Sequence, residues 1–228
     1  MLAIVPTPIG NLGDMGPRAL EALKKASIIY CEDTRRTRIL TSYFGISVLL
    51  KRYDEHNPKV LRQMLDELKS GKNIALVSDG GLPAISDPGH KIVALARREK
   101  IEVLAIPGPS AVVTALAASG LPADSFIFLG FLPRASGKRK RILETFSTLQ
   151  RTIAIYESPF RVKSLMKELA EVFISRAQCA AAREISKIHE EWFYGTLEEV
   201  KKNIDAKDPV LGEFVVMIHP KGDLFHEP

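Results

Sequence analysis

The sequence predicts a two-domain α/β fold, and three features lead to this expectation. Short apolar or β-branched segments alternate with amphipathic helical segments through the first half of the chain. Of the 228 residues, 46% are hydrophobic, which is enough for one large or two small buried cores. Beyond Gly120, strand-like segments outnumber helical ones. We therefore expect an N-terminal, mostly parallel α/β domain at 1–117 and a C-terminal mixed-sheet α/β domain at 118–228.

The first half of the chain has the alternating pattern of a parallel sheet whose crossover helices cover both faces. Pro17 opens one helical segment, since proline is tolerated in a first helical turn. Val60, Met64 and Leu68 fall on one face of another, which Gly71 ends. The expected strands are 2–5, 27–31, 48–52, 73–77 and 101–106, and the expected helices are 17–25, 34–44, 59–70, 88–99 and 110–118.

The second half begins after the segment Gly120-Leu-Pro-Ala-Asp, whose glycine and proline are typical of a linker. Its strand-like segments follow one another with fewer helices between them, which favours antiparallel pairing. The expected strands are 126–131, 153–156, 178–184, 190–194 and 213–218, and the expected helices are 138–149, 160–172 and 197–203.

Composition excludes several classes of protein. No apolar run approaches the roughly 18–20 residues of a membrane-spanning helix, and the N-terminus lacks the basic start of a signal peptide. Cys31 and Cys179 lie far apart in apolar segments, so we expect buried, reduced thiols. The five histidines lack zinc-ligand spacing. We therefore expect a cytoplasmic protein without a membrane span or a metal, and the net charge of +5 is compatible with an anionic partner such as RNA.

Four loops follow expected strands, where open α/β sheets bind their ligands. They are 6–14, 32–38, 78–89 and 107–111. The third is the most informative, because a plain connection needs only about two to six residues and this one has about a dozen. Its glycines allow close approach of a ligand to the backbone, its prolines hold the loop open, and Asp79 and Asp87 add charge. We therefore expect a ligand site at this loop.

The fourth loop places Ser110 at a helix N-terminus, whose N–H groups suit a carboxylate or a phosphate. An ordinary helix cap explains the same residue equally well. The sequence contains no G-x-G-x-x-G, G-x-x-x-x-G-K-[ST] or G-x-S-x-G motif. The residues alone therefore indicate a small-molecule site in glycine-proline loops, without covalent catalysis or a metal.

Seven ordered motifs give the sequence a specific resemblance. They are PTPIGNLGD, CEDTRRT, SDGGLPAISDPG, PGPSAV, GFLPR, YESPFR and REISK-x-HEE-x-x-x-G. Together they resemble the tetrapyrrole-methylase-fold (class III) methyltransferases, which depend on S-adenosylmethionine, and more narrowly the ribosomal RNA small subunit methyltransferase I group. One such motif would be weak evidence, but the order and spacing of seven extend the resemblance from Leu2 to about Pro220.

The resemblance implies a fold, a cofactor and a substrate. Two α/β domains would hold S-adenosylmethionine in the cleft between them, usually in a homodimer. The group methylates the ribose 2′-hydroxyl of a cytidine, numbered 1402 in the family, in 16S ribosomal RNA. The expected partner is therefore that RNA or the small ribosomal subunit.

Three alternatives stay open at this point. A methyltransferase of the same fold would act on a tetrapyrrole or a protein, but such a substrate gives no reason for the basic tract at 134–141. A non-catalytic RNA-binding relative would keep that tract and lose the cofactor. A metal-dependent phosphohydrolase would use Asp33, Asp79 and Asp87, and it would be stabilised by a divalent metal.

The resemblance also implies the residues that contact the cofactor. Asp79 would pair with its ammonium group, and Ser110 with its carboxylate. Pro8, Ile85 and Tyr156 would supply apolar walls, although core packing explains Ile85 and Tyr156 equally well. The implied cofactor residues are Pro8, Asp79, Gly80, Leu82, Ile85, Ser110, Ala111, Tyr156, Ala182 and Glu213.

Two positions depart from the family's pattern. The third motif usually reads S-D-A-G-T-P, and here Gly80 and Leu82 replace the alanine and the threonine. Both changes lie where the resemblance implies hydrogen bonds to the methionine end of the cofactor. These two positions therefore give the most direct test of the family interpretation.

A base that takes up the hydroxyl proton would assist methyl transfer. Asp33 is one candidate, because it follows a strand and precedes an arginine cluster, and Glu184 and Lys187 of the REISK motif are the others. The plain alternatives are that Asp33 caps the following helix and that Glu184 pairs with an arginine.

Segment 134–141 carries five basic residues in eight, and cations of this kind bind RNA phosphates. A solvated helix face is the plain alternative. Phe131 and Phe160 flank basic residues and would stack on unpaired bases in one interpretation, but core packing is favoured for both. The expected RNA-binding residues are Arg35, Arg36, Arg38, Arg134, Lys138, Arg139, Lys140, Arg141 and Arg161.

Overall fold

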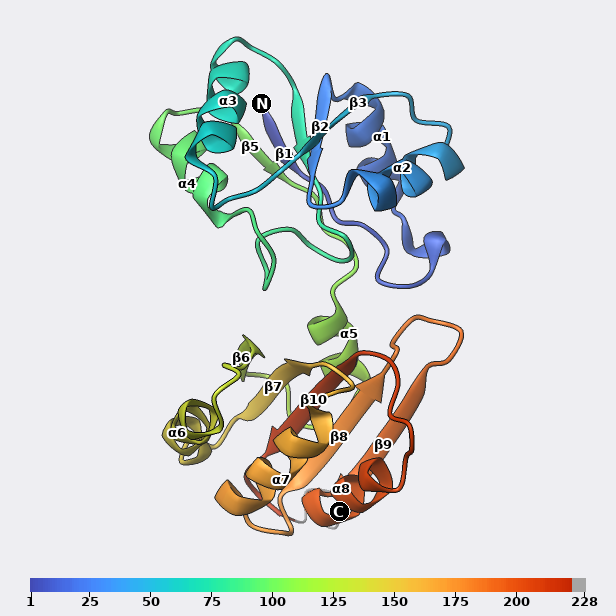
Figure 1. Cartoon of the computed structure of the whole chain (residues 1–228), viewed down its shortest axis with the longest axis vertical. Coiled ribbons are helices and arrows are strands. Elements are labelled where there is room, and N and C mark those ends of the chain that lie inside the picture. Colours follow the sequence, from blue (N-terminus) through green and yellow to red (C-terminus); the bar gives the residue numbers. More distant parts are fainter. Residues whose placement is uncertain (223–228) are drawn as a thin grey trace. The chain divides into compact units, whose positions relative to one another are not determined.

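The computed structural model describes residues 1–222 and divides into two compact units, Met1–Ser110 and a second that begins at Ala111 (Figure 1). Each unit is built on one five-stranded sheet. The first sheet is parallel and the second is mixed, so the predicted α/β fold class is confirmed. The helix that contains residue 117, the expected division, belongs to the second unit. Among residues 1–222, no helix combines the length and the apolar character that a bilayer crossing requires.

The first unit contains the strands expected for it, with small shifts at their ends, and the expected helices except 110–118, which belongs to the second unit. Its strands are β1 (Leu2–Ile4), β2 (Ile28–Cys31), β3 (Leu49–Arg52), β4 (Ile74–Leu76) and β5 (Val103–Ala105). Between them lie a 3-10 turn, η1 (Leu12–Asp14), and the helices α1 (Pro17–Lys25), α2 (Thr34–Tyr43), α3 (Pro58–Lys69) and α4 (His90–Arg98). The strand order is β3-β2-β4-β1-β5, and every neighbouring pair is parallel.

The side chains of each strand alternate between two cores, as expected for a sheet that is covered on both faces. Leu76 of β4 packs with Met64 of α3 and Ile92 of α4 on one face. Ala75 lies on the opposite face with Leu23 of α1. Figure 1 shows α3 and α4 on one side of the sheet and α1 and α2 on the other. The apolar stripe predicted for α3 therefore marks the face that is buried.

Strands β1 and β4 are neighbours, but the helices that follow them cover opposite faces of the sheet. The chain therefore leaves the carboxyl ends of these two strands in opposite directions. Open α/β sheets bind ligands at such a point, because the diverging loops leave a crevice beyond the strand ends. The loops 5–16 and 77–89 begin here, so the sheet topology alone places the predicted ligand loops together.

The second unit begins with α5 (Ala111–Ala118) and continues with five strands and three further helices. These are β6 (Phe126–Phe131), α6 (Ser136–Ser147), β7 (Thr152–Glu157), α7 (Val162–Val172), β8 (Gln178–Arg183), β9 (Glu191–Thr196), α8 (Leu197–Asp205) and β10 (Phe214–His219). The strand order is β6-β7-β10-β8-β9. Only β6 and β7 pair in parallel, and the other pairs are antiparallel, which confirms the predicted mixed sheet.

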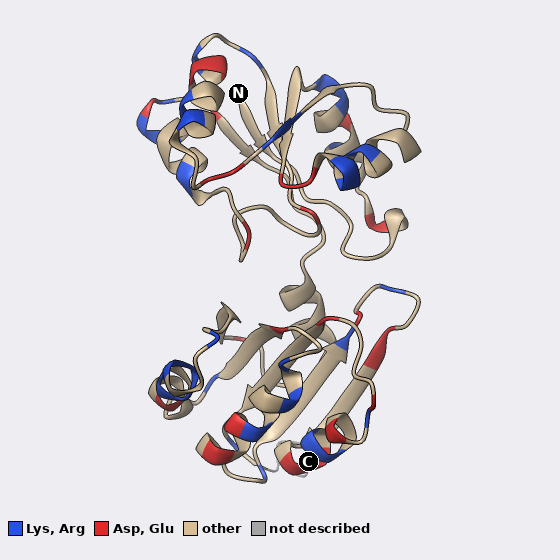
Figure 2. Ribbon diagram, viewed as in Figure 1, with Lys and Arg blue, Asp and Glu red and all other residues tan. Residues whose placement is uncertain are grey.

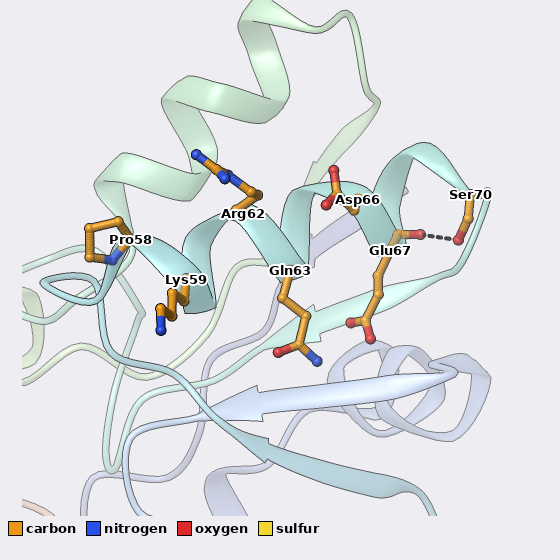
Figure 3. Close-up of a pocket in the computed structure, with 7 residues that line it drawn as sticks. All are labelled: Pro58, Lys59, Arg62, Gln63, Asp66, Glu67 and Ser70. Atoms are coloured by element: carbon orange, nitrogen blue, oxygen red, sulfur yellow. Dashed lines mark hydrogen bonds between the residues drawn. The ribbon is translucent and has the colours of Figure 1, made fainter.

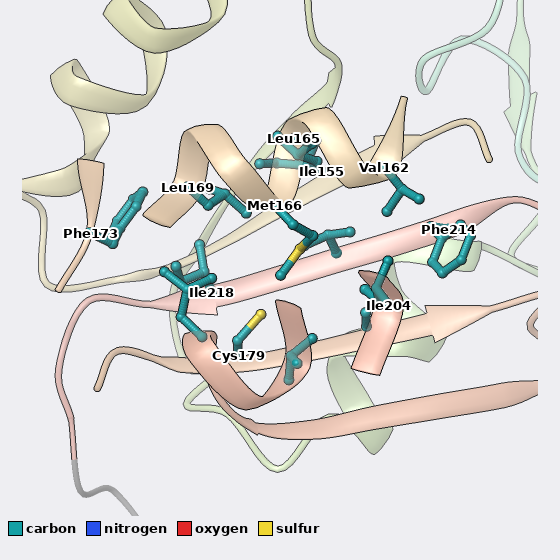
Figure 4. Close-up of a cluster of buried hydrophobic side chains, with 14 of the residues drawn as sticks. Ile155, Val162, Leu165, Met166, Leu169, Phe173, Cys179, Ile204, Phe214 and Ile218 are labelled. Carbon is teal, nitrogen blue, oxygen red and sulfur yellow. The ribbon is translucent and has the colours of Figure 1, made fainter. Parts of the chain in front are cut away.

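One face of the second sheet carries a core that it shares with α6, α7 and α8 (Figure 4). Ile155 of β7 lies there with Met166 of α7 and Ile204 of α8. Cys179 belongs to the same cluster, and Cys31 is buried in the first unit, so both thiols are buried and free as expected. Helix α5 adds no residue to this cluster and contacts β7 and β10 from the other face.

Helices α6 and α7 are joined by a buried ion pair. Arg139 and Glu168 are 5% and 3% exposed, and two guanidinium nitrogens of Arg139 lie 2.6 Å from the oxygens of Glu168. The hydroxyl of Ser136 donates to Glu168, and Arg139 donates to the hydroxyl of Ser164. Breaking such a pair costs more than the pair contributes, because the remaining charge stays buried without a partner.

We expect Glu168→Ala to lower the free energy of unfolding of the second unit by about 3–5 kcal/mol, because Arg139 would stay buried without a counter-charge. Urea unfolding followed through the fluorescence of Trp192, the only tryptophan, reports on this unit. The matched control is Glu171→Ala, which breaks a solvent-exposed pair with Lys140 between the same helices and should cost less than about 1 kcal/mol. Equal losses in the two variants would contradict the role of burial.

Candidate functional site

The loops that follow β1 and β4 are joined directly by backbone hydrogen bonds. Thr7 and Gly81 form an isolated antiparallel bridge, with N–O distances of 2.9 and 3.0 Å in the two directions. The Thr7 hydroxyl donates to the Ser78 carbonyl at 3.1 Å, and the Ser78 hydroxyl donates to the Gly81 carbonyl at 3.3 Å. These contacts fix loop 78–89 against loop 6–14 at the point where the following helices diverge.

Two glycines are required by the way these loops pack. Gly81 has a φ of +93°, a conformation that residues with a Cβ rarely adopt. At Gly108, in the loop after β5, an added Cβ would lie 2.3 Å from Cγ of Pro6. The loops after β1, β4 and β5 are therefore in close contact, as their neighbouring positions in the sheet require.

Five predicted cofactor residues lie on the loops after β1 and β4. An added Cβ on Gly80 would lie 3.4 Å from the carbonyl oxygen of Pro8, so these two residues face one another. Leu82 packs against the core shared with α3 and α4, whereas Ile85 is 44% exposed. Core packing therefore accounts for Leu82 but not for Ile85. The side chain of Asp79 is 31% exposed and forms part of an acidic cluster.

Carboxylates gather where the neighbouring strands β2 and β4 end. The backbone N–H of Asp33 donates to Oδ1 of Asp79 at 3.3 Å, and the backbone N–H of Asp79 donates to the carboxylate of Glu32. Arg36 lies 3.4 Å from Oδ2 of Asp79, and Asp87 stands close enough to raise the pKa of Glu32. In the part of the chain that the structure describes, no group of three or more His, Cys, Asp or Glu side chains is placed to hold a metal ion.

Two carboxyl groups of this cluster hold their protons unusually tightly. Burial, reinforced by the charges of Asp87 and Asp79, raises the pKa of Glu32 to about 7. Burial and the charge of Asp79 raise the pKa of Asp87 to about 6. Asp33 differs, because hydrogen bonds from the side chain and backbone of Arg35 hold its pKa well below the usual range. Near neutral pH, Glu32 is therefore the stronger base.

Asp33 has the structural role that the sequence analysis gave as the alternative to catalysis. Its side chain accepts a hydrogen bond from the backbone N–H of Arg35 at 2.8 Å and so caps α2. The sequence pattern did not single out Glu32, although a charged residue directly after the buried strand Ile28–Cys31 was the available signal. Burial raises the pKa of Glu32 most, and the charges of Asp87 and Asp79, which come from a distant segment of the chain, raise it further.

In the second unit, Tyr156 and Ala182 occupy the same row of the sheet, on either side of β10. The hydroxyl of Tyr156 accepts a hydrogen bond from the backbone N–H of Val112 at 3.0 Å, which satisfies one N–H group at the start of α5. Ala182 is fully buried. Ser110 and Ala111, predicted at the same helix start, are the last residue of the first unit and the first residue of the second.

Two predicted catalytic residues and one predicted cofactor residue form an ionic cluster beyond this row. Nζ of Lys187 lies 2.8 Å from Oε1 of Glu184 and 3.0 Å from Oε2 of Glu213. The backbone N–H of Glu213 also donates to Oε1 of Glu184 at 2.9 Å. Burial alone would raise the pKa of Glu184, but these hydrogen bonds outweigh it and lower the pKa. Glu184 thus forms its ion pair with Lys187 rather than with an arginine, and both groups stay charged.

Part of the predicted RNA-binding tract is exposed. Arg134, Lys138 and Arg141 lie on the surface. Arg139 is only 5% exposed, and its guanidinium is bonded to Glu168. Arg139 does not contribute to an exposed basic surface, because the helical repeat turns it inward while residues 138 and 141 face solvent.

The remaining basic residues are engaged to different degrees. Lys140 is ion-paired to α7, and Arg161 donates to two backbone carbonyls of the loop after β6. Arg35 and Arg36 pair with carboxylates at the ends of β2 and β4, and Arg38 is exposed. Only Arg38 of these five is an exposed cation without an ion pair among the described contacts.

A separate surface groove runs along α3 (Figure 3). It is lined by Pro58, Lys59, Arg62, Gln63, Asp66, Glu67 and Ser70. Acidic and basic side chains are mixed along it, so it favours neither an anion nor a cation. It contains none of the predicted site residues, and we assign no ligand to it.

Similarity to known proteins decides the family. The model of the Tetrapyrrole (Corrin/Porphyrin) Methylases matches residues 1–201. The chain belongs to this family. Among related tetrapyrrole methylases, Ribosomal RNA small subunit methyltransferase I of Halalkalibacterium halodurans is 43% identical over 97% of this chain and 76% of its own length. The protein of the same name from Thermotoga maritima is 43% identical over 96% of this chain and 98% of its own. The resemblance predicted from seven motifs is confirmed.

Solved structures of other tetrapyrrole methylases share the fold. A structure of diphthine synthase superimposes with a TM-score of 0.74 over 96% of this chain and 90% of its own, at 16% identity. Uroporphyrin-III C-methyl transferase from Thermus thermophilus, complexed with S-adenyl homocysteine, gives a TM-score of 0.65 at 19% identity over 95% of this chain and 96% of its own. At such identities the likeness establishes the fold and not the substrate.

The raised pKa of Glu32 predicts a loss of stability as the pH rises. Between its ordinary value of 4.5 and about 7, the unfolded chain releases a proton that the folded chain keeps. The free energy of unfolding therefore falls across this interval, and the contribution is lost once the pH has passed about 7. We expect Glu32→Gln to remove this loss, so that its stability relative to the parent protein improves by about 1–2 kcal/mol between pH 5 and pH 8, solvent screening included.

Differential scanning calorimetry at pH 5 and pH 8 measures this difference. Glu67→Gln is the matched control, because burial of Glu67 is outweighed by its hydrogen bonds to Lys51 and Tyr30, which lower its pKa. Glu67 is therefore ionised at both pH values, and its substitution should cost the same at each. An effect of Glu32→Gln that is equal at pH 5 and pH 8 would contradict the raised pKa.

Proposed function

We propose that the chain transfers a methyl group from S-adenosylmethionine to the ribose 2′-hydroxyl of a cytidine in 16S ribosomal RNA. The observation that carries this proposal is the 43% identity, over nearly the whole chain, with two proteins named Ribosomal RNA small subunit methyltransferase I. The fold alone supports less, because its structural neighbours include proteins named for a diphthine and for a uroporphyrin. The RNA substrate therefore rests on the sequence relatives.

The residues at the ends of β1, β2 and β4 fit a cationic cofactor. S-adenosylmethionine carries a sulfonium and an ammonium group, and Glu32, Asp79 and Asp87 bring negative charge to a loop whose backbone is open at its glycines. Asp79 is suited to bind the ammonium group, because its side chain is 31% exposed and its ion pair with Arg36 is long, at 3.4 Å. Apolar surface beside it comes from the exposed Ile85.

The two departures from the family motif leave this fit intact. An alanine Cβ at position 80 would make an ordinary contact of 3.4 Å with Pro8, so Gly80 occupies a place where alanine is also accommodated. Leu82 packs against the core of the first unit, where its larger apolar side chain is stabilising. Neither change removes a charged group from the acidic cluster.

The cofactor, when bound, supplies a methyl group on a positively charged sulfur. The chain must then position the hydroxyl, exclude water and take up a proton. Glu32 fits the last task, since a pKa of about 7 gives a carboxylate at neutral pH that still binds a proton. Asp33 is a weaker base, because its bonds to Arg35 favour the ionised form. Lys187 and Glu184 neutralise one another, which suits positioning better than proton transfer.

A cytoplasmic location stays a prediction from the composition. Other features stay predictions from the family resemblance. They include a homodimer, which sedimentation of the purified chain tests. They also include cofactor contacts of Ser110, Ala111, Tyr156, Ala182 and Glu213.

In vitro methylation of small ribosomal subunits that lack the modification tests the proposal directly. We expect S-adenosylmethionine-dependent formation of one 2′-O-methylcytidine, located by mapping of the modified nucleotide. Methylation of a tetrapyrrole or a protein but not of the subunit would assign another substrate of the same fold. A chain that is not stabilised by millimolar S-adenosylmethionine, with or without RNA, is not a methyltransferase.

Asp79→Asn should weaken the binding of S-adenosylmethionine about ten-fold or more, because a hydrogen bond to a charged group contributes about 1.5–3 kcal/mol. Asparagine keeps the acceptor for the backbone N–H of Asp33, so the fold should be unchanged. Isothermal titration calorimetry measures the affinity, and Asp66→Asn on α3 is the control within the same unit. Parent-like affinity in Asp79→Asn would remove Asp79 from the site.

Replacing both Lys138 and Arg141 by alanine should weaken binding to the small ribosomal subunit. It should also lower the slope of log affinity against log salt concentration by about 0.7 for each phosphate that the variant no longer neutralises. Filter binding at several salt concentrations measures both quantities. The control is the same double change at Lys201 and Lys202 of α8. If the two double variants behave alike, the α6 residues are an ordinary solvated face.

A further inference from the structure

Two phenylalanines of the second unit lie on its surface, so the core packing favoured from the sequence is wrong for both. Phe160 is 94% exposed and Phe131 is 58% exposed. Phe131 ends β6, and Phe160 follows the last residue of β7 by three positions. Because β6 and β7 are parallel neighbours, both residues lie at the carboxyl ends of adjacent strands. The loops that carry them meet, because Arg161 donates to the carbonyls of Leu132 and Pro133. Large apolar side chains exposed on neighbouring loops often mark a binding surface.

Buried charges hold the loops that carry these rings. Arg161 donates to two carbonyls of the loop after β6, at 2.8 and 3.3 Å, and pairs at 3.1 Å with Glu157, which is 1% exposed. Arg139 donates to the carbonyls of Pro133 and Arg134 at 3.2 and 2.6 Å. Two arginines that the sequence assigned to RNA phosphates therefore fix the backbone beside the rings. Rigid presentation lowers the entropy that a ligand must overcome on binding.

A β-bulge turns Phe131 toward the ring of Tyr156. The pairing of β6 with β7 shifts register between Phe128 and Phe131, where Gly130 has a φ of +60°. Without the shift, residues 128 and 131 would point to opposite faces of the sheet. Both rings instead contact Tyr156, with centroid distances of 4.8 and 5.5 Å. Phe131 is thus supported on one side while more than half of its surface stays exposed.

Exposed cations lie next to the rings in the sequence and on the following helix. Arg134 is three residues beyond Phe131, and Lys138 and Arg141 are exposed on α6, where Figure 2 shows a concentration of basic residues. Aromatic faces beside exposed cations are the combination that binds unpaired nucleotides, since bases stack on the rings and phosphates meet the cations. An apolar protein partner would account for the rings but not for the charges.

We propose that Phe131 and Phe160 form a stacking platform for an unpaired base of the RNA substrate. This inference rests on the proposed function. It adds to that function the side chains that bind the base of the substrate nucleotide. A methyltransferase acting on a ribose hydroxyl needs its nucleotide out of a helix and in one orientation. Stacking on two rings whose loops are held in place supplies that orientation without any interaction with a phosphate.

Phe160→Ala and Phe131→Ala should each weaken binding to unmodified small ribosomal subunits about ten-fold. The KM for the subunit should rise with them. The affinity for S-adenosylmethionine should not change in Phe160→Ala, which is the variant for this readout, because Phe131 contacts Tyr156, a predicted cofactor residue. The salt slope should stay at the parent value, because a phenylalanine ring neutralises no phosphate. Phe160→Trp keeps an aromatic face and should bind RNA like the parent. Ile174→Ala is the matched control, since Ile174 is a 59% exposed apolar residue of the same unit.

The outcomes separate this inference from the proposed function. Parent-like RNA affinity in both alanine variants of an active enzyme overturns the platform and leaves the function standing. Absence of methylation by the parent protein refutes the function itself. A sedimentation coefficient that changes in the alanine variants without RNA would assign the rings to an interface between two chains and overturn the platform. A lowered salt slope would do the same, because it would show that the variants neutralise fewer phosphates than the parent.

Discussion

The backbone bridge between Thr7 and Gly81 is the contact on which the chemistry of the first unit depends. Helices α1 and α4 leave neighbouring strands on opposite faces, so regular secondary structure does nothing to hold the two intervening loops together. Two reciprocal backbone hydrogen bonds and the Thr7 hydroxyl hold them instead. They limit the conformational freedom of a long loop and keep Asp79 and Gly80 in place. Because backbone groups make the bridge, it occupies neither the carboxylate of Asp79 nor the exposed side chain of Ile85.

In the second unit, arginine side chains rather than a backbone bridge hold a loop in place. A guanidinium group has five N–H donors in a fixed plane, so one arginine can bond a carboxylate and several carbonyls at once. Arg139 bonds Glu168, Ser164 and the loop after β6 in this way. Arg161 bonds the same loop and Glu157. A lysine in either place would offer a point charge without this geometry. These arginines therefore have a structural role inside the second unit.

The sequence predicted the architecture well because alternating apolar patterns are local, and a strand or helix needs little more information. It located the ligand loops because glycine, proline and strand ends are local features too. It misjudged groups whose surroundings come from distant segments. Burial, reinforced by the charges of Asp87 and Asp79, raises the pKa of Glu32 to about 7. A bulge at Gly130 turns Phe131 toward Tyr156 and away from the core against which Ile127 and Leu129 pack. One error was avoidable, because Arg139 lies four residues before the buried Leu143, and positions four apart share a face of a helix.

The acidic cluster of the first unit and the exposed basic residues of α6 interact in opposite ways with the phosphates of an RNA substrate. Glu32, Asp79 and Asp87 attract a cation and repel a phosphate, and the charges of neighbouring carboxylates add to burial in raising the pKa of Glu32 and of Asp87. The phosphates therefore have to meet other groups, and exposed cations stand on α6. The base of a nucleotide is neutral and is subject to neither interaction. A pair of phenylalanines can bind it without a charge of either sign, which is the advantage of the proposed platform over a further cation.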